Sequence, residues 1–162
     1  MTDQPMSRSP HAPVSAGERT RVQRLDRVEC WALLARERVG RVGVVVDGAA
    51  EIFPVNYTVD RSTSVTPTIL FRTDPGTKLA ALVHTPRVSF EVDSLDPAGR
   101  TGWSILVKGR AQQVDQIVDP DQRLRVEHIP LTHWSPGPKR HTIRIVPTEV
   151  TGRRIARGAS DP

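Results

Sequence analysis

Two neighbouring stretches with period-two patterning constrain the fold of this chain more than any other feature. Residues 88–93 run Val-Ser-Phe-Glu-Val-Asp, and residues 103–108 run Trp-Ser-Ile-Leu-Val-Lys. Successive side chains of a β-strand point to opposite faces of the sheet, so every second residue can be buried against a core. Each stretch therefore predicts a half-buried antiparallel strand, and together they favour a fold built mainly from sheet.

Further strands are predicted on both sides of these two. Val42–Val46 is a β-branched run, Asp47-Gly48 is a hairpin-type turn, and a second strand follows from Glu51 to Val59. Pro54 inside that strand has no N–H to donate, which indicates an edge, a bulge or an irregular point in the ladder. The remaining predicted strands are Ile69–Thr73, Thr142–Val146 and a last β segment that reaches Ile155.

The first predicted helix has a clear start signal. Asp26 and Glu29 have the spacing of a capping box, and Leu25 and Cys30 are placed as a hydrophobic staple. This pattern predicts a helix that begins near Asp26 and ends near Arg38–Gly40. Its expected apolar face consists of Val28, Ala32 and Ala35, with Trp31 and Leu34 beside them.

Two more short helices are expected. One covers Thr77–Val83, after Asp74-Pro75-Gly76 has ended the preceding strand. The other begins at Asp119-Pro120, an N-cap residue followed by proline at the first helical position, and reaches about Glu127.

About six strands and two or three short helices suggest one domain, a closed antiparallel barrel with peripheral helices. The 162 residues suffice for one core, which must be built on Val, Ile, Leu and Ala because aromatic residues make up 4%. Regular βαβ alternation is absent, which argues against a doubly wound dinucleotide-binding fold. The domain is expected over residues 21–156, with a disordered arm at 1–20 and a disordered tail at 157–162.

The charge distribution argues against a nucleic-acid partner. The formal charge is +5, of which residues 1–24 carry +2 and residues 152–162 carry +2, so the body of the chain is nearly neutral. It therefore lacks the continuous basic face expected of a nucleic-acid binder. No apolar run approaches the roughly 20 residues of a membrane span, so none is expected. The chain has one cysteine and no signal-peptide pattern, and it is therefore expected in the cytoplasm.

No catalytic or metal-ligating residue stands out. The histidines lack paired-ligand spacing, which favours structural or surface roles. Ser104 has no nucleophile-elbow context, Cys30 is expected to be buried, and the acidic pair Glu91 and Asp93 is expected to be exposed rather than catalytic. The histidines concerned are His84, His128, His133 and His141.

The segment with the most chemistry is Phe71–Leu79, which predicts a strand, a Pro-Gly turn and a helix opening on Thr-Lys. Free N–H groups at a helix N-terminus favour anions, and Gly76 lets an anion approach the backbone. Arg72 and Lys78 supply charge, and Thr73 can donate a hydroxyl hydrogen bond. These are the parts of a monophosphate site. A solvated turn with surface Arg and Lys remains the alternative from the residues alone.

Two other segments could contact a ligand. In Pro54-Val55-Asn56-Tyr57, Asn56 offers a donor and an acceptor, and Tyr57 offers a ring and a hydroxyl. The alternative is a strand interrupted by proline. In Gly102-Trp103-Ser104, Trp103 is more often a core residue, and Ser104 lies on the opposite face of the strand.

In order and spacing, these segments resemble the pyridoxamine 5′-phosphate oxidase-like flavoproteins, especially the short actinobacterial-type members, over about residues 24–156. The matching motifs are Gly-Arg-Val-Gly at 40–43, Pro-Val-Asn-Tyr at 54–57, Phe-Arg-Thr-Asp-Pro-Gly-Thr-Lys-Leu at 71–79, Phe-Glu-Val-Asp at 90–93, Gly-Trp-Ser at 102–104, Lys-Gly-Arg-Ala at 108–111 and Thr-Gly-Arg-Arg-Ile at 151–155.

The resemblance implies a six-stranded split β-barrel with Greek-key topology and a homodimer with FMN at the subunit interface. It implies a flavin-dependent oxidoreductase that acts on a small molecule. The residues implied in cofactor binding are Pro54, Val55, Asn56 and Tyr57 at the ring and ribityl region, Phe71, Arg72, Thr73, Gly76 and Lys78 at the phosphate, and Trp103 and Ser104 nearby.

The chain departs from the true pyridoxamine 5′-phosphate oxidases near its C-terminus. Those enzymes carry an Arg-Leu-His-Asp-Arg-like segment that helps to bind substrate, whereas residues 151–156 here read Thr-Gly-Arg-Arg-Ile-Ala. This difference argues against vitamin B6 oxidation. The alternatives are a deazaflavin-dependent reductase, a flavin carrier without turnover, and a basic-tailed interaction module with no cofactor.

Overall fold

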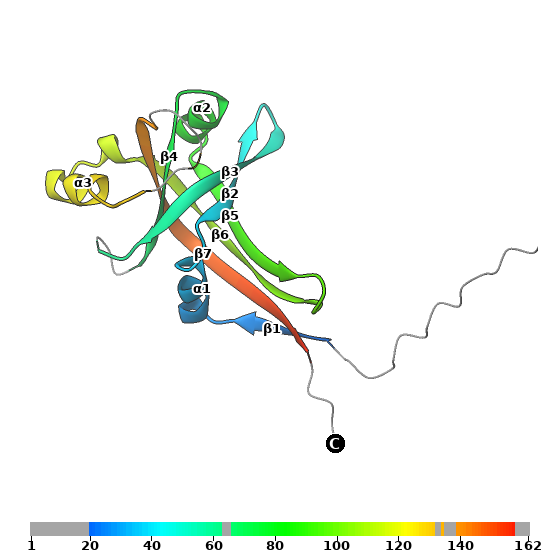
Figure 1. Ribbon diagram of the computed structural model, residues 1–162. Coiled ribbons are helices and arrows are strands. Elements are labelled where there is room, and N and C mark those ends of the chain that lie inside the picture. The colour runs from blue at the N-terminus through cyan, green and yellow to red at the C-terminus, as the bar shows by residue number, and fades with distance from the viewer. Residues whose placement is uncertain (1–19, 63–65, 132–133, 135–138, 158–162) are drawn as a thin grey trace, which may run out of the picture.

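The computed structural model describes residues 20–62, 66–131, 134 and 139–157 (Figure 1). This part of the chain contains seven strands, three α-helices and one short 3-10 helix. In chain order the elements are β1 Thr20–Leu25, α1 Arg27–Leu34, β2 Val39–Val46, β3 Ala49–Asp60, β4 Thr68–Thr73, α2 Thr77–His84, β5 Arg87–Asp96, β6 Thr101–Gln113, η1 Val114–Gln116, α3 Pro120–Glu127 and β7 His141–Arg157.

All strand pairs are antiparallel, and the sheet order is β1-β7-β4-β3-β2-β5-β6 with a further pairing of β7 to β6. Six strands, β2 to β7, therefore form a closed hydrogen-bonded circuit, and β1 joins it at β7. The expectation of a mainly β, antiparallel fold with three short helices is confirmed. The number of strands in the sheet is seven rather than six.

Strand β1 is absent from the sequence-based prediction, because only Leu25 of its six side chains is buried. Without alternating burial there is no period-two signal, and this edge strand forms through its ladder with the end of β7. Thr20, the last residue of the expected arm, is the first residue of β1, and residues 1–19 lie outside the described residues. Similarly Arg157 ends β7, and 158–162 lie outside the described residues.

The last two predicted β segments form one strand, β7, of 17 residues. The register shifts where Lys108 and Gly109 face Glu149 and Pro147, so β7 carries an extra residue at this point. A bulge tolerates the missing N–H of Pro147, which is why the strand continues through a residue that normally interrupts a ladder.

The capping box of α1 is confirmed. The Glu29 N–H donates to Asp26 Oδ1 at 2.8 Å, and the Asp26 N–H donates to Glu29 Oε2 at 3.0 Å. The predicted helix end is wrong, because α1 ends at Leu34 rather than near 38–40. By Arg38 the chain has already reached the sheet, where its carbonyl accepts from the Tyr57 N–H.

The predicted apolar face of α1 is wrong in part, because Trp31 and Leu34 are buried as expected but the other three residues are not. Val28 is 79% exposed, and Ala32 and Ala35 are exposed as well. The helix instead buries the neighbouring face, which carries the larger side chains and more apolar area. These buried residues are Cys30, Trp31, Leu33 and Leu34.

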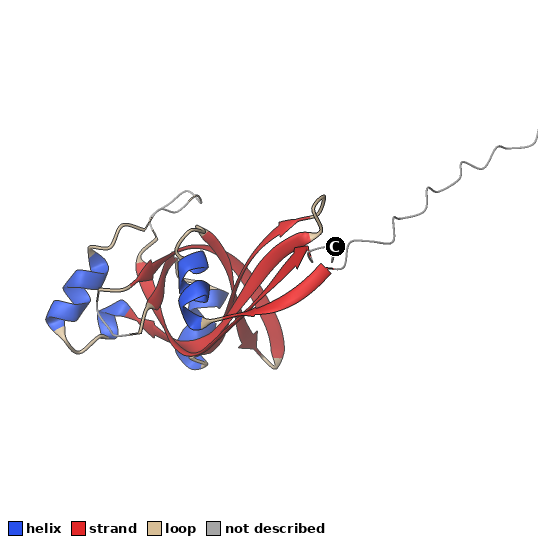
Figure 2. Ribbon diagram, turned by 90° about the horizontal axis from the view of Figure 1, so that it is seen from below, coloured by secondary structure: helices blue, strands red, loops and turns tan. Residues whose placement is uncertain are grey.

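The inward side chains of the strand circuit form the main core, and Phe71 and Phe90 are fully buried in it. A second cluster lies outside the circuit, where Leu70 of β4 packs with Val114 and Val126 beneath η1 and α3. Arg144 of β7 also links α3 to the sheet, because it donates to Gln122 Oε1 of α3 at 3.0 Å and to Gln112 Oε1 of β6 at 2.8 Å. Figure 2 shows α3 beside one end of the strands, apart from α1 and α2.

Candidate functional site

The turn from β4 into α2 presents a helix N-terminus that no side chain caps. Asp26 and Asp119 cap α1 and α3, whereas the N-cap of α2 is Gly76, with a φ of 154° and no capping hydrogen bond. A positive φ of this kind favours glycine. The first N–H groups of α2 are therefore without a capping side chain, which is the local condition for binding an anion.

Lys78 and Lys139 concentrate positive charge at this turn. Lys139 Nζ lies 2.5 Å from Asp74 Oδ2, and this hydrogen bond lowers the pKa of the Asp74 carboxyl. Burial, together with the charge of Lys139, lowers the pKa of the Lys78 ammonium, which lies 5.3 Å from the centre of the Phe53 ring. Lys78 is thus a partly desolvated cation beside a second lysine. The Asp74 carboxylate interacts with both ammonium groups.

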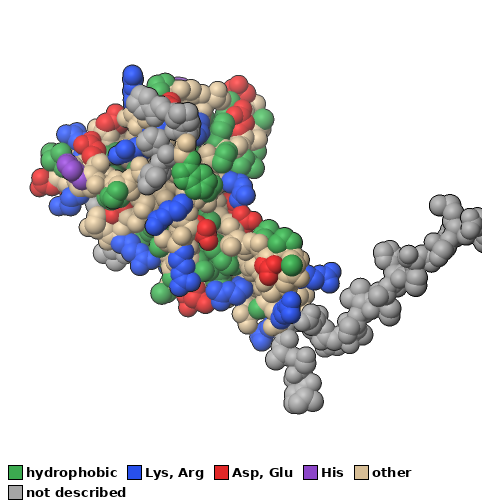
Figure 3. All heavy atoms as spheres, viewed as in Figure 1, with side chains coloured by type: hydrophobic (Ala, Val, Ile, Leu, Met, Phe, Trp, Pro, Cys, Tyr) green, Lys and Arg blue, Asp and Glu red, His purple; other side chains and the backbone are tan. Residues whose placement is uncertain are grey.

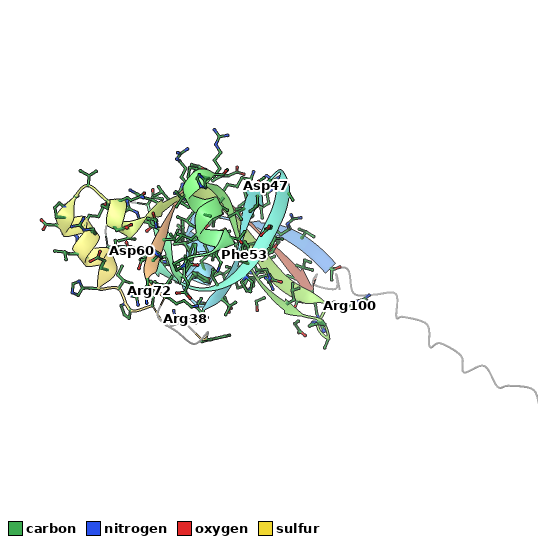
Figure 4. All side chains as sticks on the ribbon, turned by 90° about the horizontal axis from the view of Figure 1, so that it is seen from above. Arg38, Asp47, Phe53, Asp60, Arg72 and Arg100 are labelled. Atoms are coloured by element: carbon green, nitrogen blue, oxygen red, sulfur yellow. The ribbon has the colours of Figure 1, made fainter. Side chains whose placement is uncertain are left out.

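Arg72 lies on the outer face of β4, since its neighbours Phe71 and Thr73 are buried on the inner face. It lines a cavity of about 400 Å³ together with Lys139 and Arg140. Figure 4 shows Arg72 on the side of the molecule where α3 lies. Lys139 therefore connects Arg72 with the N-terminus of α2.

Lys139 and Arg140 were missed by the sequence-based prediction. They belong to the basic run Lys-Arg-His at 139–141, whose last residue begins β7. The β7–β4 ladder pairs His141 with Thr73 and so brings this run to the α2 turn. The basic run beside a predicted strand end could have indicated a second source of charge for the site. The sequence alone, however, does not show which strand pairs with the strand that follows this run.

The predicted segment 54–57 is divided between two faces of β3. Pro54 and Asn56 face outward, whereas Val55 and Tyr57 are buried. Asn56 accepts a hydrogen bond from the Trp134 N–H at 2.9 Å and donates to the Arg38 carbonyl at 3.4 Å. Outward residues can offer side chains to a ligand, whereas the inward ones can offer only backbone groups.

The Tyr57 hydroxyl already has a structural partner. It donates to the Leu34 carbonyl at 2.6 Å, its ring contacts Phe90 edge-on at 4.9 Å, and burial raises its pKa well above the usual range. The side chain thus fastens the end of α1 to β3.

Replacement of Tyr57 by phenylalanine separates a ligand role from this structural one. We expect Tyr57→Phe to lose about 1–3 kcal/mol in the free energy of unfolding, because the buried Leu34 carbonyl loses its donor. Flavin affinity should be unchanged. Urea unfolding and a flavin titration of the same variant measure the two effects, and a large loss of affinity at unchanged stability would assign Tyr57 to the ligand instead.

Trp103 and Ser104 lie far from the α2 turn. They face Arg154 and Arg153 on β7, whereas Thr73 at the end of β4 faces His141. At ~3.3 Å per residue, these points are roughly 40 Å apart along β7. Ser104 lines a different cavity, of about 700 Å³, next to β1. One chain therefore does not bring all the predicted residues together.

The acidic pair on β5 has a structural partner on β2. Arg41 Nη1 contacts Glu91 at 2.9 Å and Asp93 at 2.7 Å, so the two carboxylates share one guanidinium on the outer face. Cys30 is buried, and burial raises the pKa of its thiol.

In the described part of the chain, no three His, Cys, Asp or Glu residues are grouped so that they could hold a metal ion. None of the described helices has the length and apolar character needed to cross a membrane.

Comparison with known proteins finds one matching family and several similar proteins. Residues 26–154 match the family described as pyridoxamine 5′-phosphate oxidase. A protein of Mycobacterium tuberculosis, the uncharacterized protein Rv0080, is 35% identical over 156 residues, which cover 93% of this chain and 95% of that protein.

Solved structures are similar over nearly the same region. The FAD binding protein from Mycobacterium smegmatis superposes with a TM-score of 0.65 at 36% identity, over 82% of this chain and 98% of that one. A FAD-binding protein from Mesorhizobium loti gives a TM-score of 0.68 at 26% identity, over 85% of this chain and 98% of the other.

Proposed function

Because this chain belongs to the pyridoxamine 5′-phosphate oxidase family, we propose that it is a flavin-binding protein that holds FMN by its phosphate at the N-terminus of α2. The observation that carries the proposal is the uncapped start of α2 beside Lys78 and Lys139, which share a single carboxylate. A phosphate would accept hydrogen bonds from the N–H groups and restore the charge balance around Lys78.

In this proposal the closed circuit of strands β2 to β7 is the split barrel of the family. The residues of the site then have distinct roles in binding the flavin. Lys78, with Arg72 and Lys139 beside it, binds the phosphate, and Gly76 keeps the approach to the backbone open. The outward face of β3, with Pro54 and Asn56, lies beside the ring and ribityl chain. The bound flavin supplies two-electron hydride chemistry, and the protein supplies position and electrostatics.

The choice between FMN and FAD depends on what lies beyond the first phosphate. Two similar structures are of proteins described as binding FAD. FAD carries a second phosphate and an adenosine, for which the cavity lined by Arg72, Lys139 and Arg140, together with Asp115 and Glu127, is the available space. FMN needs only the α2 turn. A deazaflavin remains the alternative for a reductase of this fold.

We also propose that the working unit is a homodimer with the flavin at the interface. The proposal is supported by the separation of roughly 40 Å along β7 between the phosphate residues and Trp103 with Ser104. If both groups contact one flavin, the second group must come from a second chain. Vitamin B6 oxidation is not proposed, because residues 151–156 read Thr-Gly-Arg-Arg-Ile-Ala and lack the Arg-Leu-His-Asp-Arg-like segment.

An absorption titration tests the central proposal. We expect the purified protein to bind FMN at micromolar concentration with one flavin per chain, and to sediment as a dimer. Parallel titrations with FAD and with a deazaflavin rank the three cofactors. If none of them binds to the protein, the proposal fails. If flavin binds but NADPH and NADH do not reduce it, the protein is a carrier rather than a reductase.

A further inference from the structure

A second, chemically different groove opens on the outer surface between β2 and β5, with a volume of about 690 Å³. The ladder between these strands spans only Arg41–Gly43 against Ser89–Glu91, although β2 continues to Val46 and β5 begins at Arg87. Where the ladder ends, the β2–β3 hairpin projects from the sheet (Figure 1). None of the residues predicted to bind flavin lines this groove.

The groove combines an apolar wall with a rim of three cationic side chains. Val45 and Ile52 are 50% and 68% exposed, on a hairpin where Figure 3 shows hydrophobic side chains next to acidic ones. At the rim, Arg87 and Arg110 face each other directly in the β5–β6 ladder. Lys108, also at the rim, is paired with Glu149 at 3.0 Å.

Among the residues that the structure describes, no carboxylate pairs with Arg87 or Arg110. Like charges directly opposite each other on antiparallel strands are destabilising. An anion between the two guanidinium groups would remove this repulsion and could accept paired hydrogen bonds from both.

We propose that this groove binds a small amphipathic carboxylate, with the carboxylate between Arg87 and Arg110 and its apolar body against Val45 and Ile52. The volume lies in the range usual for small-molecule sites, about 300–1,000 Å³. Charge also argues against a second copy of the chain in this place. A two-fold contact centred on the groove would bring two such arginine pairs together.

Calorimetric titration of the full-length protein with octanoate and with 1-octanol, which has the same chain without the charge, tests the proposal. We expect octanoate to bind with one site per chain. Replacing Arg87 and Arg110 together by glutamine should weaken octanoate binding at least tenfold and leave octanol binding unchanged. Ile52→Asn should weaken the binding of both compounds.

The matched control removes two exposed arginines that do not line the groove, Arg36 in the turn after α1 and Arg125 on α3, as R36Q with R125Q, and should leave octanoate binding unchanged. The R87Q/R110Q variant should unfold at no lower urea concentration than the parent, because it loses a like-charge pair. Equal octanoate affinity in R87Q/R110Q and the parent overturns the proposal. The proposal is also overturned if Ile52→Asn converts a dimeric protein into monomers. That result would show that a second chain covers the groove in the parent protein.

Discussion

Replacing Arg72 and Lys78 together by alanine is expected to weaken flavin binding at least a hundredfold. Each change removes a charge-assisted contact to phosphate worth about 1.5–3 kcal/mol, and about 1.4 kcal/mol corresponds to a factor of ten. Each single variant should therefore lose at least tenfold. Absorption titrations of both single variants and the double variant measure these losses.

The contribution of Lys78 has a pH signature of its own. Burial and Lys139 lower its pKa, whereas bound phosphate stabilises the ammonium form. Flavin affinity should therefore be full below the lowered pKa of Lys78 and decline as the pH rises through it. Lys78→Arg keeps its charge at alkaline pH and should remove this decline.

A matched control removes two exposed arginines of α1 and α3 that do not line the Arg72 cavity, Arg27→Ala with Arg125→Ala, which changes the net charge equally. This variant should bind flavin like the parent. If the parent and the Arg72→Ala, Lys78→Ala double variant bind flavin with equal affinity, the phosphate does not bind at the α2 turn. That result would contradict the proposed phosphate site even though flavin still binds.

Phe90→Ala is expected to lose about 3–5 kcal/mol in the free energy of unfolding, a large share of the stability of a domain of this size. The Phe90 ring is fully buried, contacts the Tyr57 ring edge-on and covers Gly40. Its removal leaves a cavity where β2, β3 and β5 meet. Urea unfolding measures the loss, and Val28→Ala, at a position 79% exposed, is the control and should change stability little.

A companion variant tests the same contact from the opposite side. A Cβ at Gly40 would overlap the Phe90 ring, so Gly40→Ala should also destabilise the protein. Phe90→Leu should relieve part of that overlap. We therefore expect the Gly40→Ala, Phe90→Leu double variant to be more stable than the sum of the single losses predicts. Strict additivity would contradict the packing described for this part of the core.

Local patterns were sufficient where the deciding interactions are close in sequence. The capping box of α1 depends on residues three apart, and the Asp119 cap of α3 depends on neighbours in the next turn. The period-two stretch at 88–93 buries its alternate residues as predicted, because strand geometry alone places them on one face.

The errors occur where a distant segment decides the outcome. α1 buries Trp31 and Leu34 as predicted but exposes Val28. The strands that the helix meets decide which face packs, above all β7, where Gly152 lies close to Cys30. β1 was missed because its order comes from a ladder with residues 152–157. Neither partner can be inferred from spacing within a short window.

The proposed phosphate site shows the same division. Residues 71–79 by themselves specify a strand, a glycine turn and a helix that opens on Lys78, since each depends on local backbone preference. The arrival of Lys139 beside Lys78, the outward position of Arg72 and the burial of Tyr57 depend on the pairing of β4 with β7 and β3. Strand pairing joins segments about 70 residues apart, and it sets which side chains meet because a strand exposes alternate residues to opposite faces.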